Sequence, residues 1–352
     1  MIPIYKPYMP EVPLLNEILQ SGKLAYGEYG KEFERLLSDY FDTKNLIVTN
    51  TFNMAILVAL STLGIKAGDA VIVSPMACLA STQPLLSMGI TVVWADVNPL
   101  TGTLDPESVR QTVANNPKAK AIIHNHFCGH LGFIDEINAL GREFGIPVID
   151  DGIEAFGSIY KNKKIGNVGT DVTIFSFNPV RIPNTLDGGL VIFKDEALHK
   201  KSLLVRDAGI DRTRFRDGLG EIRPDCDIDI MGHSATPIEL NSYIGIQQMK
   251  KVDWIIETQR SNAAKWDEIL QIQDDIEPLQ IRENLPNYWV YGTLAKDKRK
   301  SLIKFREKGY YASSVHLNNN FYSVFGKTKS LIGVKNFYNH FLALPCGWWF
   351  NK

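Results

Sequence analysis

Short apolar runs alternate with helical patterns through the first two thirds of this 352-residue chain. The runs lie at 46–49, 70–74, 91–95, 119–124 and 147–149, and helical patterns at 54–63, 81–87 and 134–144 separate several of them. This alternation is typical of βαβ units, in which helices bury both faces of a parallel sheet. Two more runs, 173–177 and 189–193, flank a loop and are expected to be adjacent strands. The sequence therefore predicts an α/β fold with a mainly parallel sheet.

The pattern changes after about residue 235. Residues 239–271 form a long helical pattern, and an α+β pattern follows it. This second pattern consists of a strand near 288–294, a helix at 299–308 and a strand near 312–316. We predict a large domain over residues 1–235, whose N-terminal segment holds two helices around a glycine-rich turn, and a smaller domain over residues 236–352.

Composition excludes several classes of partner. The net charge of -1 provides no basic field for nucleic acid or anionic lipid. The four cysteines are far apart and form no CxxC pair, so neither a disulfide framework nor a zinc site is indicated. No signal-peptide pattern or bilayer-spanning apolar stretch is present. We therefore expect a cytoplasmic protein with no nucleic-acid and no membrane partner.

Several segments, taken in order along the chain, resemble one enzyme family. Residues 175–177, followed by Arg181 and by 187–189, resemble the cofactor-lysine loop of the DegT/DnrJ/EryC1/StrS sugar aminotransferases, which reads roughly Phe-Ser-Phe-x-x-x-Lys. Further similar passages lie at 2–7, 21–24, 63–73, 95–99, 104–106, 148–151, 154–157, 308–310, 315–316 and 344–345. The resemblance implies a fold type I aminotransferase-like architecture with a seven-stranded sheet and a pyridoxal-phosphate (PLP) cofactor. It also implies a homodimer with its pocket at the interface, and a nucleotide-linked sugar of surface-polysaccharide (for example lipopolysaccharide) metabolism as substrate.

Arg181 stands where the family has its Schiff-base lysine. A guanidinium stays protonated and is a poor nucleophile, so it cannot take over that role. PLP is thus implied by the resemblance, while the absence of the lysine predicts that its Schiff-base chemistry is lost or altered. Arg181 is suited to bind a phosphate or carboxylate in bidentate fashion. A salt bridge to Asp151, Glu154 or Asp187 that fills an inactive site is an equal alternative.

Three more residues are catalytic candidates beside Arg181, with acid or base roles. Asp151 ends a predicted strand, where open α/β sheets bind ligands, and the resemblance assigns it to the pyridinium nitrogen. Capping of the next helix is its structural alternative. Glu154 replaces a glutamine near the 3-oxygen of the ring, where a carboxylate repels the phenolate; a solvated or salt-bridged role is the alternative. His316 lies in a segment similar to the substrate side of the family, and a purely structural histidine is equally consistent.

Other positions are assigned to the cofactor by the resemblance. Thr51 and Phe52 begin the helix expected to hold the phosphate, although an ordinary N-capped helix is an alternative. Leu79 replaces an aromatic residue that stacks on the pyridine, and it offers no π face. Ser176 matches a phosphate-binding serine. Ser234 replaces an asparagine that donates to the phosphate of the neighbouring subunit.

The histidines at 124, 126 and 130 suggest a metal at first sight, but they match a strand-end turn of the family and no carboxylate spacing supports a ligand set. We therefore expect no metal. The preferred interpretation is a family protein that acts on or binds a nucleotide-linked sugar without PLP–lysine chemistry. Three alternatives are open: a lysine-independent, dehydratase-like PLP or pyridoxamine-phosphate enzyme, a noncatalytic binding or scaffold subunit, and a transaminase whose lysine comes from residues 161–164.

Overall fold

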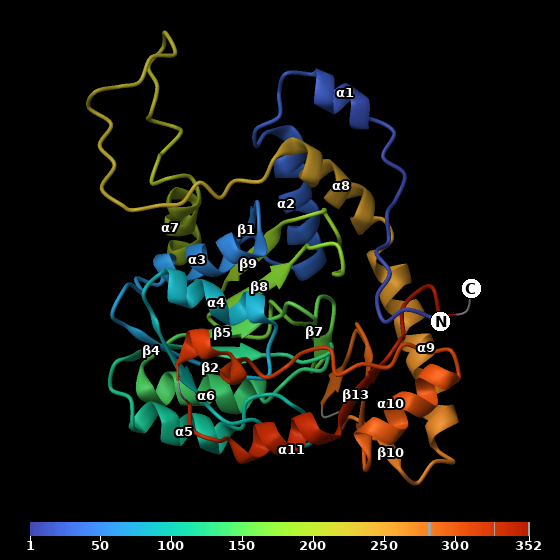
Figure 1. Cartoon of the computed structure of the whole chain (residues 1–352). Helices are drawn as coiled ribbons and strands as arrows, with labels where there is room; N and C mark the ends of the chain where they lie inside the picture. The colour runs from blue at the N-terminus through green and yellow to red at the C-terminus, as the bar shows by residue number, and fades with distance from the viewer. Residues whose placement is uncertain (281–282, 327, 351–352) are drawn as a thin grey trace.

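A seven-stranded sheet forms the centre of the protein (Figure 1). The structure is a computed structural model that describes residues 1–280, 283–326 and 328–350. The strands are β1 (Leu46–Thr49), β2 (Ala70–Val73), β3 (Thr91–Trp94), β4 (Ala119–Asn125), β5 (Val148–Asp151), β8 (Val172–Ser176) and β9 (Gly189–Phe193). Their order is β1-β9-β8-β5-β4-β2-β3. Only β9 runs against its neighbours β8 and β1, so the prediction of a mainly parallel sheet, with 173–177 beside 189–193, is confirmed.

Helices cover both faces of this sheet because successive strand residues point to opposite sides. On one face, Val71 and Val73 of β2 belong to a core cluster with α3 (Phe52–Thr62), α4 (Leu79–Ser87) and α7 (Glu196–Arg206). On the other face, Ile72 packs with α5 (Pro106–Ala114) and α6 (Ile134–Phe144). Farther along that second face, β1 and β9 pack against α2 (Glu28–Phe41), which in turn contacts α8 (Glu239–Met249).

A smaller antiparallel sheet, β10-β12-β13, lies toward the C-terminus. Its strands are β10 (Ile276–Pro278), β12 (Tyr291–Ala295) and β13 (Phe341–Leu344), and α9 (Val252–Leu270) and α10 (Lys298–Glu307) pack against it. The remaining elements are α1 (Leu15–Gln20), α11 (Ile332–His340), the short strands β6 (Ile159–Tyr160), β7 (Lys163–Lys164) and β11 (Asn284–Leu285), and two 3-10 turns at 319–321 and 323–325. The α+β character expected after residue 235 is present, and the domain division at residues 235 and 236 stays a prediction.

Two expected elements differ from the structure. The single helix predicted over 239–271 is two helices, α8 and α9, separated at Lys250 and Lys251. Lys251 has φ -123° and ψ -4°, which is outside helical geometry. The strand predicted near 312–316 is wrong: Ser313 forms one isolated bridge with Ala343, and Val315 has a positive φ of 59°, which interrupts an extended backbone.

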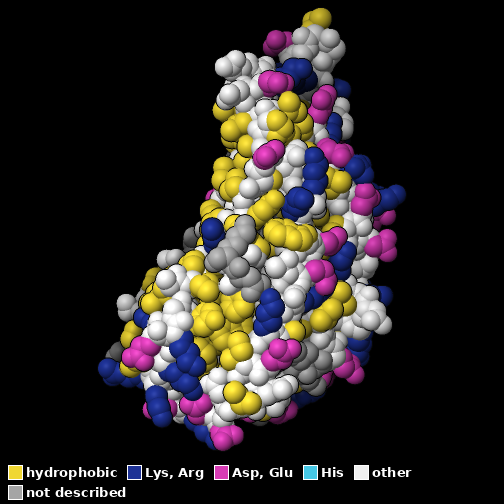
Figure 2. All heavy atoms as spheres, turned by 90° about the vertical axis from the view of Figure 1, so that its right-hand side faces the viewer, with side chains coloured by type: hydrophobic (Ala, Val, Ile, Leu, Met, Phe, Trp, Pro, Cys, Tyr) yellow, Lys and Arg dark blue, Asp and Glu magenta, His cyan; other side chains and the backbone are white. Residues whose placement is uncertain are grey.

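The two ends of the described chain lie close together beside α9, and the segment between α7 and α8 projects from the body as an extended arm (Figure 1). Figure 2 shows a band of hydrophobic side chains on the face that carries both termini. The N-terminal region and α9 contribute exposed apolar residues, among them Met9, Leu19, Leu24 and Trp254. No helix in the described ranges is both long and apolar enough to cross a bilayer.

Substitutions at Phe305 and Ile303 of α10 test how the core beside the smaller sheet is packed. Phe305 is 1% exposed and packs edge-on against Trp266, whereas Ile303 is 47% exposed. We expect Phe305→Ala to lower the free energy of unfolding by about 3–5 kcal/mol, because it leaves a cavity. Ile303→Ala, measured in parallel by urea unfolding, should change it by less than about 0.5 kcal/mol. Equal losses in the two variants would contradict this packing.

Candidate active site

Three of the predicted positions meet at one edge of the large sheet. Asp151 ends β5 and Ser176 ends β8, and the two strands are parallel, so both residues lie at the carboxyl edge where open α/β sheets bind ligands. Gly189 pairs with Ser176 and lies against the backbone of Thr51. The start of α3 is therefore at the same edge.

Arg181, Glu154 and His316 form one buried cluster beside this edge. Arg181 Nη1 lies 3.4 Å from Glu154 Oε1, and His316 Nε2 lies 2.7 Å from the same oxygen. The other carboxylate oxygen accepts a hydrogen bond of 2.8 Å from the backbone N–H of Cys128. The sequence interpretation that Arg181 forms a salt bridge to Glu154 thus matches the geometry. The side chains of Arg181 and Glu154 are only 6% and 2% exposed.

Three residues that the sequence interpretation did not single out build the same cluster. The Arg181 guanidinium carbon lies 4.1 Å from the centroid of the Trp289 ring, a cation–π contact, and Tyr5 stacks on that ring at 4.8 Å. Asn287 donates from Nδ2 to the Glu154 carbonyl and accepts from the Trp289 backbone N–H. Apart from the bond between Asn287 and Trp289, these contacts join segments more than 100 residues apart, so no local pattern indicates them.

The pKa values of the two carboxyl groups shift in opposite net directions, although burial acts to raise both. Burial raises the pKa of Asp151 to about 6, and its contacts with Ser81 and the Ile153 backbone N–H oppose this rise only in part. Burial also acts to raise the pKa of Glu154, but His316 and Arg181 more than offset it and hold this pKa below its ordinary value. Glu154 is therefore the fixed anion of the cluster, and Asp151 is the group that exchanges a proton near neutral pH.

The adjacent Asp150 faces the opposite side of β5 and meets two buried histidines. His124 Nδ1 lies 3.1 Å, and His126 Nε2 3.3 Å, from Asp150 Oδ1. Burial acts to raise the pKa of Asp150, yet the histidines hold it below its ordinary value. The Gly132 backbone N–H donates to His126 Nδ1, so the neutral ring carries its hydrogen on Nε2 and has no lone pair there for a metal. The expectation that no metal binds stays a prediction, but its premise is wrong, because Asp150 adds a carboxylate and the donor atoms of the three side chains lie within 4.8 Å of one another.

The positions assigned to a phosphate are near one another, but most of their polar groups are engaged. The Thr51 hydroxyl accepts from the Met54 N–H as the N-cap of α3, and the Phe52 ring is buried in the core. Ser176 donates to Asn178 Oδ1 at 2.6 Å. The Ser234 carbonyl accepts from Asn50 Nδ2, next to the α3 turn of its own chain. Leu79 begins α4 and is half-buried.

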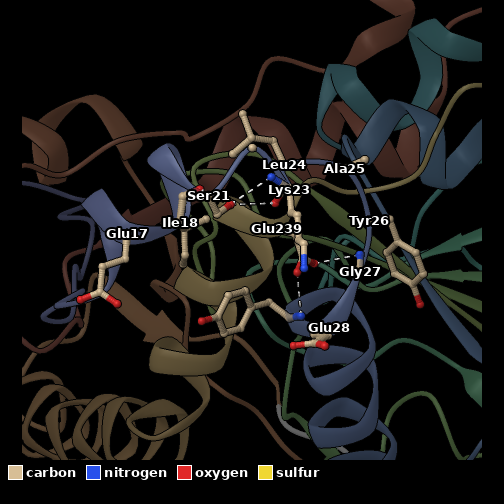
Figure 3. Close-up of a pocket in the computed structure, with 12 residues that line it drawn as sticks. Glu17, Ile18, Ser21, Lys23, Leu24, Ala25, Tyr26, Gly27, Glu28 and Glu239 are labelled. Carbon is tan, nitrogen blue, oxygen red and sulfur yellow. Dashed lines mark hydrogen bonds between the residues drawn. The ribbon is translucent and has the colours of Figure 1, made fainter.

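A separate pocket of about 670 Å³ lies between α1, α2 and α8 (Figure 3). Glu239 of α8 points into the turn at the start of α2, and its carboxylate accepts from the backbone N–H groups of Gly27, Tyr29 and Gly30. This carboxylate therefore caps the helix and compensates its dipole. None of the predicted site residues lines this pocket.

The residues of the cluster do not fit a lysine-bound PLP. Within the ranges that the structure describes, no lysine forms a hydrogen bond or ion pair with Arg181, Glu154 or Asp151. The proposed substitutes are engaged elsewhere: Lys161 pairs with Asp135, and Lys164 donates to the Tyr40 carbonyl. Among the described residues, neither Lys161 nor Lys164 is therefore bonded to the cluster that Arg181 forms.

The fold is that of the fold type I aminotransferases. The sequence model of the DegT/DnrJ/EryC1/StrS aminotransferase family matches residues 10–350, and the chain belongs to this family. It is 26% identical to the spore coat polysaccharide biosynthesis protein SpsC of Bacillus subtilis, over 95% of this chain and 89% of that protein. It is 25% identical to the UDP-4-amino-4,6-dideoxy-N-acetyl-beta-L-altrosamine transaminase of Helicobacter pylori, over 94% and 88%. The crystal structure of sugar aminotransferase CalS13 from Micromonospora echinospora superposes with a TM-score of 0.92 at 25% identity, covering 99% of this chain and 96% of that chain.

The raised pKa of Asp151 makes stability depend on pH. Because its folded pKa is about 6 and its ordinary value is 3.8, the folded state binds more protons between these values, and stability falls as the pH rises through this window. Asp151→Asn removes this cost. We expect the variant to gain stability relative to the natural chain between about pH 4.5 and pH 7.5, as measured by urea unfolding. The exposed Asp274→Asn is the control, and a parallel gain there, or a constant difference for Asp151→Asn, would contradict the assignment.

Proposed function

We propose that this family member acts on or binds a nucleotide-linked sugar of surface-polysaccharide biosynthesis, and that PLP–lysine chemistry is lost. The observation that carries this proposal is the contact of Arg181 with Glu154 and Trp289, at the position where the family resemblance expects a lysine. The named relatives support the substrate class: one is a polysaccharide biosynthesis protein and another is a transaminase of a UDP-linked sugar. The order of strands and the carboxyl edge of the sheet support a ligand site at Asp151.

In this proposal each side chain of the cluster has one role. Arg181 provides a permanent positive charge that orients an anionic group of the substrate. Glu154 stays ionised and holds His316 through Oε1, so that the imidazole has a fixed orientation in the cluster. Asp151, with a pKa of about 6, is the group that takes up or releases a proton near neutral pH.

A second candidate keeps the cofactor without the lysine. Asp151 is available to a pyridinium nitrogen, and no described residue accepts a hydrogen bond from the backbone N–H of Phe52 or Asn53 at the start of α3. A helix N-terminus with free N–H groups attracts phosphate. These two observations favour noncovalent binding of PLP or its amine form over a scaffold role with no ligand.

The proposal also includes a homodimer in the cytoplasm, and the domain division at residues 235 and 236. The exposed apolar side chains on the face of Figure 2, and Leu219 and Met231 on the projecting arm, support a self-complementary interface. Leu219 and Met231 are 90% and 80% exposed in a single subunit.

Titration with PLP tests the loss of lysine chemistry. We expect the natural chain to show no aldimine absorbance band that borohydride traps, because Arg181 stands where the family has its lysine and a guanidinium forms no such imine. Arg181→Lys supplies that amine and should produce a trappable band, detected also as the added mass of reduced PLP on the peptide that spans this position. Arg299→Lys, an exposed change in α10, is the matched control.

Thermal unfolding with UDP-glucose and with PLP separates the candidates. A rise in melting temperature with the nucleotide sugar alone supports the preferred function, because a ligand that binds the folded state stabilises it. A rise with PLP and no trapping supports the lysine-independent enzyme. A trapped aldimine in the natural chain would overturn the proposed loss of lysine chemistry.

Light scattering tests the dimer. We expect a mass of twice the 39.5 kDa chain, and a shift toward the monomer in Trp254→Asp, which places a charge on the apolar face. Ile303→Asp in α10 is the control, since it also changes an exposed apolar residue. A natural chain that is monomeric at all concentrations would exclude the homodimer.

A further inference from the structure

The turn after β4 holds Glu154 through its backbone. The N–H of Cys128 donates to Glu154 Oε2 at 2.8 Å. The other oxygen of this carboxylate meets His316 and Arg181, and Arg181 lines a narrow cleft together with Tyr5. The position of the Cys128 N–H therefore helps to fix where the anion of the candidate site lies.

This turn has a backbone conformation that a cysteine rarely adopts. Phe127 and His130 exchange both backbone hydrogen bonds, at 3.0 and 2.9 Å, so the turn has two central residues. They are Cys128, with a φ of 57°, and Gly129, with a φ of 88°. A left-handed conformation is uncommon for a residue other than glycine and persists only where its surroundings hold it. Contacts outside the two central residues therefore keep the Cys128 N–H directed at Glu154.

The side chain of His126 closes the loop that contains this turn. Its Nδ1 accepts a hydrogen bond of 3.1 Å from the backbone N–H of Gly132, so the segment 126–132 is joined at its two ends. On the other side of the ring, Nε2 lies 3.3 Å from Asp150 Oδ1. The backbone N–H of His126 donates to the Asp151 carbonyl at 3.2 Å. The imidazole is 0% exposed, so no solvent competes with the contacts that tie the loop to the end of β5.

His130 is an internal comparison in the same turn. It is also buried, but neither of its ring nitrogens has a hydrogen-bond partner among the residues that the structure describes. Its ring packs edge-on against Tyr288 at 5.5 Å. Two histidines four positions apart thus differ in their contacts: the ring of His126 joins polar groups across the loop, whereas the ring of His130 fills space.

We propose that His126 is a positioning residue of the candidate site: the hydrogen bond from Gly132 to its Nδ1 sets the loop that places the Cys128 N–H on Glu154. Through Glu154, this bond also fixes the orientation of His316. That the placement serves a nucleotide-linked sugar rests on the proposed function. The placement itself requires no ligand.

Two amide substitutions separate the two sides of the His126 ring. In His126→Asn the amide oxygen stands two bonds from Cβ, as Nδ1 does, and can accept from the Gly132 N–H. In His126→Gln the amide lies one carbon farther out, on the side of Asp150, and the acceptor for Gly132 is lost. Both variants keep a polar side chain of similar size, so they differ mainly in which contact survives.

Nuclear magnetic resonance of nitrogen-labelled histidine rings, without ligand, measures the result. The chain has seven histidines, and His316→Gln assigns the signals of His316. We expect His126→Gln to shift these signals, because Glu154 loses its N–H donor and no longer holds the His316 ring in one orientation. His126→Asn should leave them unchanged. His130→Leu is the matched control and should also leave them unchanged, and circular dichroism checks that each variant is folded.

The outcomes separate this inference from the proposed function. Unchanged His316 signals in both amide variants, or equal shifts in both or in His130→Leu, would overturn the positioning role. In calorimetric titration with UDP-glucose we expect about 10-fold weaker binding by His126→Gln than by the natural chain, as loss of a hydrogen bond to a charged group provides. Shifted signals with unchanged affinity would refute a positioning role in binding. A natural chain that binds no nucleotide sugar would refute the proposed function, while the His316 signals would still decide the placement.

Discussion

The carboxylate of Glu154 is the point on which the candidate site depends. It receives a backbone N–H from the turn after β4, an imidazole from the segment after α10 and the guanidinium of the loop between β8 and β9. A carboxylate that is 2% exposed is stable only when such partners surround it. One ionised group therefore fixes the mutual positions of three segments that are distant in sequence. Asn287 adds a fourth, since it hydrogen-bonds the Glu154 carbonyl and holds Trp289 against Arg181.

Two consecutive aspartates have different environments because they lie on opposite faces of the sheet. Asp150 and Asp151 point to opposite faces of β5 because side chains alternate along a strand. Asp150 meets two histidines and stays ionised, and its network joins β4 to β5 inside the core. Asp151 meets few donors, so burial keeps its proton affinity high at the open edge. The same residue type thus stabilises the sheet on one face and provides a titrating group on the other.

The sequence predicted the sheet well because its signal is local: each strand is a short apolar run and each crossover is a helical pattern. It also named Arg181, Glu154 and His316, which the structure brings into contact. Trp289 and Tyr5 could not be found this way, because their role arises from stacking between segments near opposite ends of the chain. The break between α8 and α9 was missed because Lys250 and Lys251 provide no glycine or proline, and the apolar spacing continues on both sides. The prediction of a strand at 312–316 was wrong for a similar reason. Val315 is β-branched, and such residues favour strands, so the sequence does not indicate the positive φ of this residue.

The cleft beside Arg181 is assembled from both ends of the described chain. Tyr5, Lys6 and Tyr8 come from the first ten residues, while Trp348 and Trp349 come from the last described ones. Trp349 donates to the Pro3 carbonyl at 2.8 Å, and Tyr8 meets Trp348 edge-on. During synthesis the N-terminal segment must therefore wait until Trp348 and Trp349 have left the ribosome before this cleft exists. A chain that stops before these residues still contains every strand of the central sheet and lacks this cleft.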